Sequence, residues 1–229
     1  MTRLIMLCVL LCLPGRAATP PFAQRVQFVI DAYAHPKTAG PLGYANIAAK
    51  LRLHEDAAQC SRRLEELLAA GPTGDMFWMF PITAIAYLDQ GQLSDSARQA
   101  LRSSLRTYMP YRGDTENHWL LYYTSLYLMA QMWPDQSGDQ WYTGKTSAEN
   151  LREAEGWINS WVRLTTTRGQ GEYDSPHYMG LYFLSMSYLA EWAKDPAMGK
   201  RRDDAGLFDR RLRRRKSRWH LRGRALPSV

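Results

Sequence analysis

Helical segments of two kinds alternate along this chain, and this alternation restricts the possible folds more than any other feature. Segments 76–88, 116–132 and 176–194 are apolar on nearly every side, whereas segments 94–108 and 147–165 are amphipathic. A helix that is apolar all round must be surrounded by protein, and an amphipathic helix faces solvent on one side. The alternating order therefore predicts stacked helical hairpins, with inner and outer helices.

Two further segments, 22–34 and 55–70, also have helical periodicity, and no segment shows the sustained alternation of a strand. The fold class we predict is all-α. The inner helices begin at irregular intervals, which argues against a short consensus repeat. We therefore favour an α/α toroid built from inner and outer helical hairpins. The predicted helices are fewer than a closed ring needs, so we expect the toroid to be incomplete.

The N-terminus has the pattern of a secretory signal peptide. An apolar run over 4–13 follows a basic residue, is too short to cross a bilayer, and ends in small residues. We expect cleavage after residue 17, a periplasmic or secreted protein, and no membrane attachment after cleavage. Cleavage removes two of the three cysteines and leaves Cys60 alone, so no intrachain disulfide can form. We expect Cys60 to be a buried, inert thiol.

The net charge of +7 comes entirely from the C-terminal end of the chain. Residues 200–229 contain twelve basic and three acidic side chains, and the remaining residues have a net charge of −2. The body of the protein, which we assign to 18–199, therefore gives no electrostatic reason to bind nucleic acid. The Arg-rich tail is typical of a shifted reading frame, and we expect it to be disordered. A basic arm that binds polyanions and an ordinary solvated tail are the alternatives.

A polar loop with a glycine leads into the apolar segment that starts at 116. The loop reads Arg-Gly-Asp-Thr-Glu-Asn-His and ends at His118. Asp114 or Thr115 can cap the helix. The first turn then contains Glu116, Asn117 and His118, and its free N–H groups suit a carboxylate or a sulfate. The alternative is that the acids only cap the helix while His118 packs against its own helix.

A second loop of the same kind leads into the apolar segment that starts at 176. It reads Arg-Gly-Gln-Gly-Glu-Tyr-Asp-Ser-Pro-His-Tyr, with a serine cap followed by proline at the first helical position. Because parallel inner helices bring equivalent ends to the same rim, we expect the two loops to lie together. A capped helix with an aromatic core residue is the plain alternative. The candidate residues of this loop are Arg168, Glu172, Tyr173, His177 and Tyr178.

These two helix starts resemble those of the α/α-toroid polysaccharide lyases, in particular the alginate lyase and heparinase II/III-like groups. The resemblance is based on Asn117-His118, Arg168 and His177-Tyr178, and covers roughly residues 74–195 in hairpin order. It implies cleavage of an acidic, uronate-containing glycan by β-elimination. No cofactor is implied, and no His/Cys cluster has metal-ligand spacing. In this chain the rest of the toroid is not found, so we expect little or no activity from the chain as written.

The resemblance also implies roles for individual residues. Asn117 and His118 would neutralise the uronate carboxylate, and Tyr178 would act as base and acid. His177 would be a second base, while Arg168 would orient the substrate or lower the pKa of the tyrosine. Tyr173 is an alternative to Tyr178. Independently of the resemblance, we expect Glu116 and Glu172 to contact the substrate and the rings of Trp78 and Trp119 to stack on sugars, although aromatic rings at helical spacing are more often core.

Two other functions fit the sequence. A glycoside hydrolase on the same scaffold would use a pair of the loop acids as proton donor and base, and the candidates are Asp114, Glu116, Glu172 and Asp174. A non-catalytic helical protein would bind glycans or other partners. The sequence gives no prediction of oligomeric state.

Overall fold

The computed structural model describes residues 20–38, 40–69, 76–107, 113–172 and 175–200. The predicted signal peptide, the basic tail, Tyr173 and Asp174 lie outside the described residues. Within them the chain is helical and contains no strand, which confirms the all-α fold class. No helix in this part of the chain is long and apolar enough to span a membrane.

Most of the helices match the segments predicted from periodicity, and one was missed. The missed helix is α3, which lies between the first two predicted segments. Two short elements, a 3-10 turn at Gly138–Gln140 and α10 at Pro196–Gly199, were also not predicted. The longer helices are α2 (Phe22–Ala34), α3 (Tyr44–Leu53), α4 (Ala57–Ala69), α5 (Met76–Leu88), α6 (Asp95–Thr107), α7 (Glu116–Met132), α8 (Ser147–Arg168) and α9 (Pro176–Trp192).

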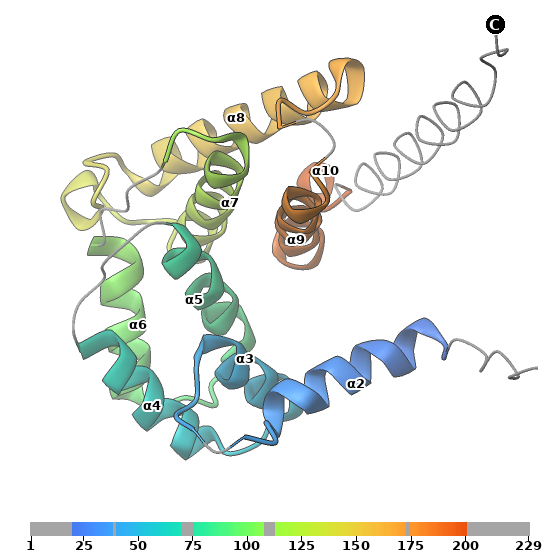
Figure 1. The fold of residues 1–229 in the computed structure, drawn as a ribbon. Coiled ribbons are helices and arrows are strands. Elements are labelled where there is room, and N and C mark those ends of the chain that lie inside the picture. Colours follow the sequence, from blue (N-terminus) through green and yellow to red (C-terminus); the bar gives the residue numbers. More distant parts are fainter. Residues whose placement is uncertain (1–19, 39, 70–75, 108–112, 173–174, 201–229) are drawn as a thin grey trace, which may run out of the picture.

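The helices form two layers of a curved array (Figure 1). Neighbouring contacts run α3 to α5, α5 to α7 and α7 to α9 in the inner layer, and the outer helices α4, α6 and α8 cover it. Helix α2 packs against α3 at one end of the array. This is the predicted order of inner and outer hairpins. Closure of the array into a toroid stays a prediction.

Burial follows the predicted helix type in α6 and α7, whereas α9, which was predicted to be enclosed, has an exposed stripe at His177, Gly180, Leu184, Ser187 and Glu191. In α7 every residue from Leu120 to Gln131 is buried, so this helix is enclosed by its neighbours. In α6 the buried residues are confined to one stripe, at Ala97, Leu101, Ser104 and Leu105. A fully buried leucine contributes about 1.5–3 kcal/mol through removal of apolar surface from water. The buried leucines of α7 therefore contribute substantially to stability.

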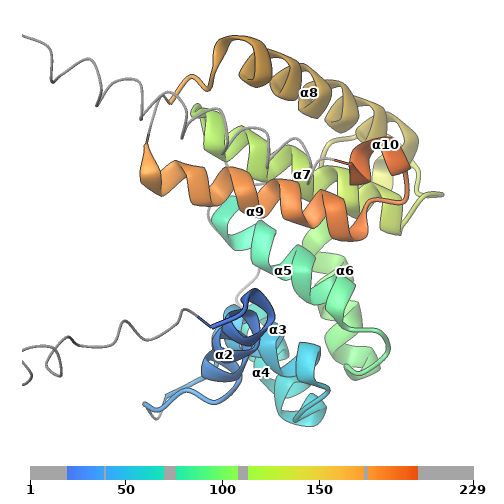
Figure 2. The ribbon, with the colours of Figure 1, turned by 90° about the vertical axis from the view of Figure 1, so that its right-hand side faces the viewer.

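The inner helices α5, α7 and α9 run parallel, with their N-terminal ends on the same side (Figure 2). At their C-terminal ends Gln131 connects all three. Its Nε2 donates to the Tyr87 hydroxyl and to the Trp192 carbonyl, both at 2.8 Å, and its Oε1 accepts from the Lys194 N–H at 2.6 Å. Since Gln131 is buried, this network satisfies polar groups that water does not reach.

Local sequence explains where the later helices begin. Ser175 accepts from the N–H of Tyr178, and proline occupies the first helical position of α9, as predicted. Thr146 and Glu149 form a capping box at α8.

Cys60 is a free thiol with no exposed surface, which confirms that it is buried, and burial raises its pKa.

Candidate functional site

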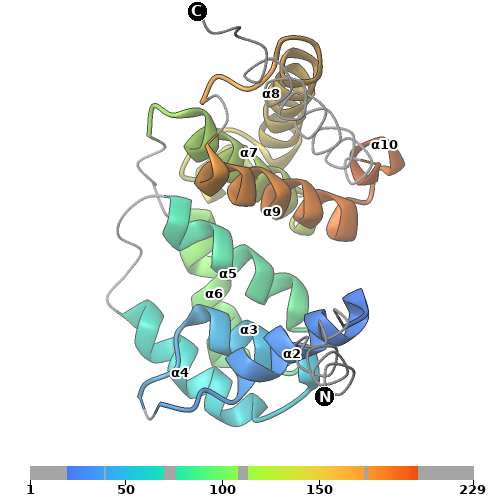
Figure 3. The ribbon, with the colours of Figure 1, turned by 45° about the vertical axis from the view of Figure 1, so that its right-hand side comes forward.

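The two loops singled out in the sequence meet at the N-terminal ends of the inner helices. Figures 2 and 3 show the starts of α5, α7 and α9 on the same side of the array. Two contacts define this rim. The ring of Phe77, at the start of α5, lies 5.2 Å from the imidazole of His118 in an edge-to-face arrangement. Glu172, in the loop before α9, is hydrogen-bonded to Asn117 of α7.

Glu172 supplies the N-terminal cap of α7 from a position 55 residues away. Thr115 occupies the N-cap position, but its side chain makes no capping hydrogen bond. Instead the Glu172 carboxylate accepts from the backbone N–H of Asn117 at 3.2 Å and from its side-chain Nδ2 at 2.8 Å. A carboxylate at this place also interacts favourably with the helix dipole, by about 0.3–1 kcal/mol.

Glu116 makes the reciprocal contact to the second loop. Its Oε2 accepts from the backbone N–H of Glu172 at 3.0 Å, and its Oε1 accepts from the indole N–H of Trp161 at 2.6 Å. Gly171 allows this close approach, because a Cβ atom there would lie 3.2 Å from the Glu116 Oε2. Each glutamate therefore fixes the backbone of the opposite loop.

The hydroxyl of Tyr182 lies between the two carboxylates. It donates to Oε2 of Glu172 at 2.8 Å and is 3.2 Å from Oε2 of Glu116. Tyr182 is only 2% exposed. Burial, the hydrogen bond to Glu172 and the charge of Glu116 all raise its pKa, so the phenol stays protonated. Within the described part of the chain, neither glutamate forms an ion pair.

His118 is held beside this cluster in a defined orientation. Its Nδ1 is 2.7 Å from the Thr115 hydroxyl, which accepts a hydrogen bond from Asn117 Nδ2 at 3.1 Å. When the Thr115 hydroxyl donates to Nδ1, a neutral imidazole carries its proton on Nε2. Gly113, at φ +74°, allows the ring to lie against the loop backbone.

The predicted residues of α9 and of the end of α8 lie near this rim, outside the hydrogen-bonded cluster. Tyr178 is half-buried, and its ring contacts that of His177 at 5.7 Å. His177 and Arg168 are exposed, and Arg168 is the last residue of α8. Within the described residues, none of these three side chains forms a hydrogen bond or ring contact with Glu116, Asn117 or Glu172.

Four of the predicted residues make contacts within the protein that their predicted roles did not include. Asn117 is 2% exposed and its Nδ2 is used by Glu172 and Thr115, so in this structure it positions the loops rather than meeting a substrate carboxylate. The carboxylates of Glu116 and Glu172 are likewise engaged within the protein. The ring of Trp119 packs on Trp157 and donates to the Gly113 carbonyl, so it belongs to the interface of α7 and α8.

Trp78 is half-buried on α5 and packs against the core, so it is not an open stacking surface.

Sequence reasoning missed Tyr182 and Trp161, which complete the cluster. Tyr182 lies one helical turn after Tyr178 on α9, a spacing that places both on one face. Trp161 lies on the outer helix α8, and no local sequence signal indicates that it reaches Glu116.

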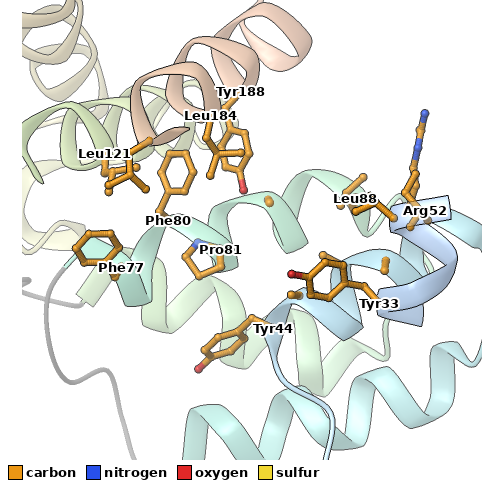
Figure 4. Close-up of a pocket in the computed structure, with 17 residues that line it drawn as sticks. Tyr33, Tyr44, Arg52, Phe77, Phe80, Pro81, Leu88, Leu121, Leu184 and Tyr188 are labelled. Carbon is orange, nitrogen blue, oxygen red and sulfur yellow. The ribbon is translucent and has the colours of Figure 1, made fainter. Parts of the chain in front are cut away.

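An apolar pocket of about 470 Å³ opens next to the rim (Figure 4). Phe77 joins the two, since it lines the pocket and contacts His118. Figure 4 shows the hydroxyls of Tyr33 and Tyr188 directed into the hollow. Helices α2, α3, α5, α7 and α9 all contribute to the lining, which is otherwise mostly aliphatic and aromatic.

In the described residues no group of three or more His, Cys, Asp or Glu side chains is arranged to hold a metal ion. Comparisons of the chain with known protein families, with curated proteins and with solved structures gave no match. The site must therefore be interpreted from its own geometry.

Proposed function

We propose that this protein acts on uronate-containing glycans and cleaves them by β-elimination, as a polysaccharide lyase. The observation that supports the proposal is the reciprocal pairing of Glu116 and Glu172 with the opposite loops. This pairing brings an imidazole and a phenol, which are distant in the sequence, to the ends of adjacent parallel helices. A signal peptide, as predicted from the sequence, would export the protein to where such polymers occur.

The reaction requires two groups with different tasks. A base removes the proton on C5 of the uronate, the electron pair forms the C4=C5 double bond, and the bond from C4 to the glycosidic oxygen breaks. The departing oxygen then takes a proton from an acid. The C5 proton becomes removable only when fixed donors stabilise the charge that develops on the neighbouring carboxylate. A well-placed acid or base contributes a further factor of about 10²–10⁴.

We assign the donor role to His118. With Nδ1 accepting from Thr115, its Nε2–H is available to the substrate carboxylate. Asn117 and Glu172 are positioning residues, because they hold Thr115 and the start of α7 in place. Tyr178 is the proposed base and acid, with His177 beside it as the second candidate. Arg168, the last residue of α8, is the cation proposed to orient the substrate.

The pocket beside His118 suits the rest of the sugar chain. Sugar rings pack their C–H faces on aromatic side chains, and Phe77 presents such a ring next to the imidazole. Phe77 is 44% exposed, which is high for a large apolar side chain. Exposed aromatic surface at the edge of a pocket is a common property of ligand sites.

A second candidate is glycoside hydrolysis by Glu116 and Glu172. The specific observation in its favour is that both carboxylates lie within hydrogen-bonding distance of the single Tyr182 hydroxyl. Retaining glycosidases place two carboxyl groups about 5–5.5 Å apart. In this mechanism one glutamate attacks the sugar and the other protonates the leaving oxygen.

One assay separates the two mechanisms. The protein is incubated with uronate polymers, and both the ultraviolet absorbance of the unsaturated uronate and the number of new reducing ends are followed. The assay is run on two proteins. One is this chain, and in the other the codons after residue 200 are translated in the alternative reading frame considered for the basic tail. β-Elimination gives both signals, and hydrolysis gives reducing ends alone. If both versions of the protein produce no unsaturated uronate and no new reducing ends, both candidates are contradicted.

Matched variants identify the residues responsible. Under the lyase proposal Tyr178→Phe and His118→Gln each lower the rate at least about 10²-fold, because a proton-transfer group or a charge-stabilising donor is lost. Tyr127→Phe and His35→Gln serve as controls, since these side chains lie away from the rim. Under the hydrolase proposal Glu116→Gln or Glu172→Gln removes activity while Tyr178→Phe retains it.

A further inference from the structure

Three arginines on α6 follow one another at intervals of four residues, which places them along one face of the helix. The first, Arg98, has carboxylate partners: its guanidinium lies 2.5 Å from Asp95 and 3.7 Å from Asp89. The other two are Arg102 and Arg106. Among the described residues neither forms an ion pair with a carboxylate.

The groups that Arg102 and Arg106 contact directly are neutral. The guanidinium of Arg102 lies over the ring of Trp133, 5.9 Å from its centroid. Arg106 donates to the side-chain oxygens of Gln136 at 2.5 Å and of Gln140 at 3.4 Å. The Nε atoms of both arginines are buried and have no hydrogen-bond acceptor in the described structure.

This arrangement is unfavourable unless something else balances it. Like charges four residues apart on a helix destabilise it by about 0.2–0.5 kcal/mol. A buried donor without an acceptor costs about 1–3 kcal/mol, and more when the group is charged. Burial and the charge of Arg102 lower the pKa of Arg106. Two adjacent, half-buried guanidinium groups without a carboxylate partner form a place where an anion can bind.

We propose that Arg102 and Arg106 together bind an oxyanion, a sulfate or carboxylate group, beside Trp133 and Gln136. The planar guanidinium groups present paired N–H donors that match two oxygens of such a group. Gln136 uses its Oε1 for Arg106, so its Nε2 is a further donor at the same place. The nearby carboxylate of Asp139 accepts from Ser137 and from Gln140 and leaves the two arginines unneutralised.

This site is separate from the rim. Trp133 is the C-cap of α7, whereas His118 lies in its first turn. A helix of 17 residues is about 25 Å long, so the arginine site is about one helix length from the candidate catalytic groups. The inference therefore does not depend on the proposed function. A second anion site would suit a long acidic polymer, and it would equally suit a free inorganic anion.

Binding is tested by NMR on the full chain, with the side-chain Nε–Hε signals of the arginines followed during titration with sodium sulfate at constant ionic strength. Saturable shifts are expected for Arg102 and Arg106, while Arg98 stays unchanged because its carboxylates already occupy it. No saturable shift, or equal shifts for all three arginines, would overturn the proposal. The wild-type titration needs no variant, so a folding defect cannot obscure it.

Variants and ligands sharpen the test. Arg102→Gln and Arg106→Gln should weaken sulfate binding by about tenfold or more, whereas the matched change Arg98→Gln should leave it within about twofold. Equal weakening by all three changes would contradict the site. A sulfated oligosaccharide and its uncharged counterpart are titrated in parallel. Tighter binding of the sulfated sugar than of free sulfate supports the site with a glycan as the source, and equal binding supports it with the free anion.

Discussion

At the scale of single residues, Glu172 and Tyr182 connect the two loops of the site. The carboxylate of Glu172 accepts both N–H groups of Asn117, and the phenol of Tyr182 shares its hydroxyl with two carboxylates. Without that hydroxyl the two negative groups would face each other unmediated. The site is therefore held by neutral donors, and its stability depends on the phenol remaining protonated.

This dependence predicts a loss of stability at alkaline pH. The folded-state pKa of Tyr182 is raised above its unfolded value of about 10, so its contribution is fully present below pH 10 and is lost as the pH rises further. Burial also raises the pKa of Tyr87 and of Tyr127, each to about 12. We expect the free energy of unfolding in urea to decrease above about pH 10.

The variant Tyr182→Phe isolates the contribution of this phenol. Above about pH 10, it should reduce the slope of the free energy of unfolding against pH by up to about 1.4 kcal/mol per pH unit, because one proton fewer is released on unfolding. It should also destabilise the protein at neutral pH by about 1–3 kcal/mol, since the carboxylates lose a donor. An unchanged slope between pH 9 and 11 would show that Tyr182 ionises as easily in the folded state as in the unfolded state.

At the scale of the helices, the C-terminal ends of α5, α7 and α9 depend on one amide. Gln131→Met keeps the side-chain volume and removes hydrogen bonds to Tyr87, Trp192 and Lys194. We expect a loss of about 1–3 kcal/mol in the free energy of unfolding, because these partners stay buried without it. As a control, Gln99→Ala at an exposed position should change the free energy of unfolding by no more than about 0.5 kcal/mol. Equal unfolding midpoints for the two variants would contradict the predicted role of Gln131.

Sequence periodicity predicted the long helices well because their burial is either complete or restricted to one stripe. The bounds of α5 and α7 agree with the predicted ones. Helix α3 was missed because it has ten residues and no strong capping residue. Its N-cap is Gly43, whose N–H is satisfied by Asn46 from within the helix. Short helices of this kind are fixed by contacts with their neighbours, here α2, α4 and α5.

At the scale of the whole molecule, the sequence predicted that two loops meet but not how they are joined. Parallel inner helices bring their starts together, and this could be inferred from the order of apolar and amphipathic segments. The pairing of Glu172 with Asn117, and of Glu116 with Trp161, depends on side chains from separate helices. No local pattern specifies such contacts. The same limit applies to Asn117, whose burial changed its expected role from substrate contact to positioning.

The central claim is that the two loops form one unit through Glu172 and Asn117, and a double-mutant cycle tests it most directly. Urea unfolding is measured for Asn117→Ala, for Glu172→Ala and for the double variant. A control cycle combines Glu172→Ala with Gln99→Ala instead of Asn117→Ala. We predict an interaction energy of about 1–2 kcal/mol for the pair, within the range found for residues in one hydrogen-bond network, and none for the control. Additive effects of Asn117→Ala and Glu172→Ala would contradict the account, because the two loops would then not be joined.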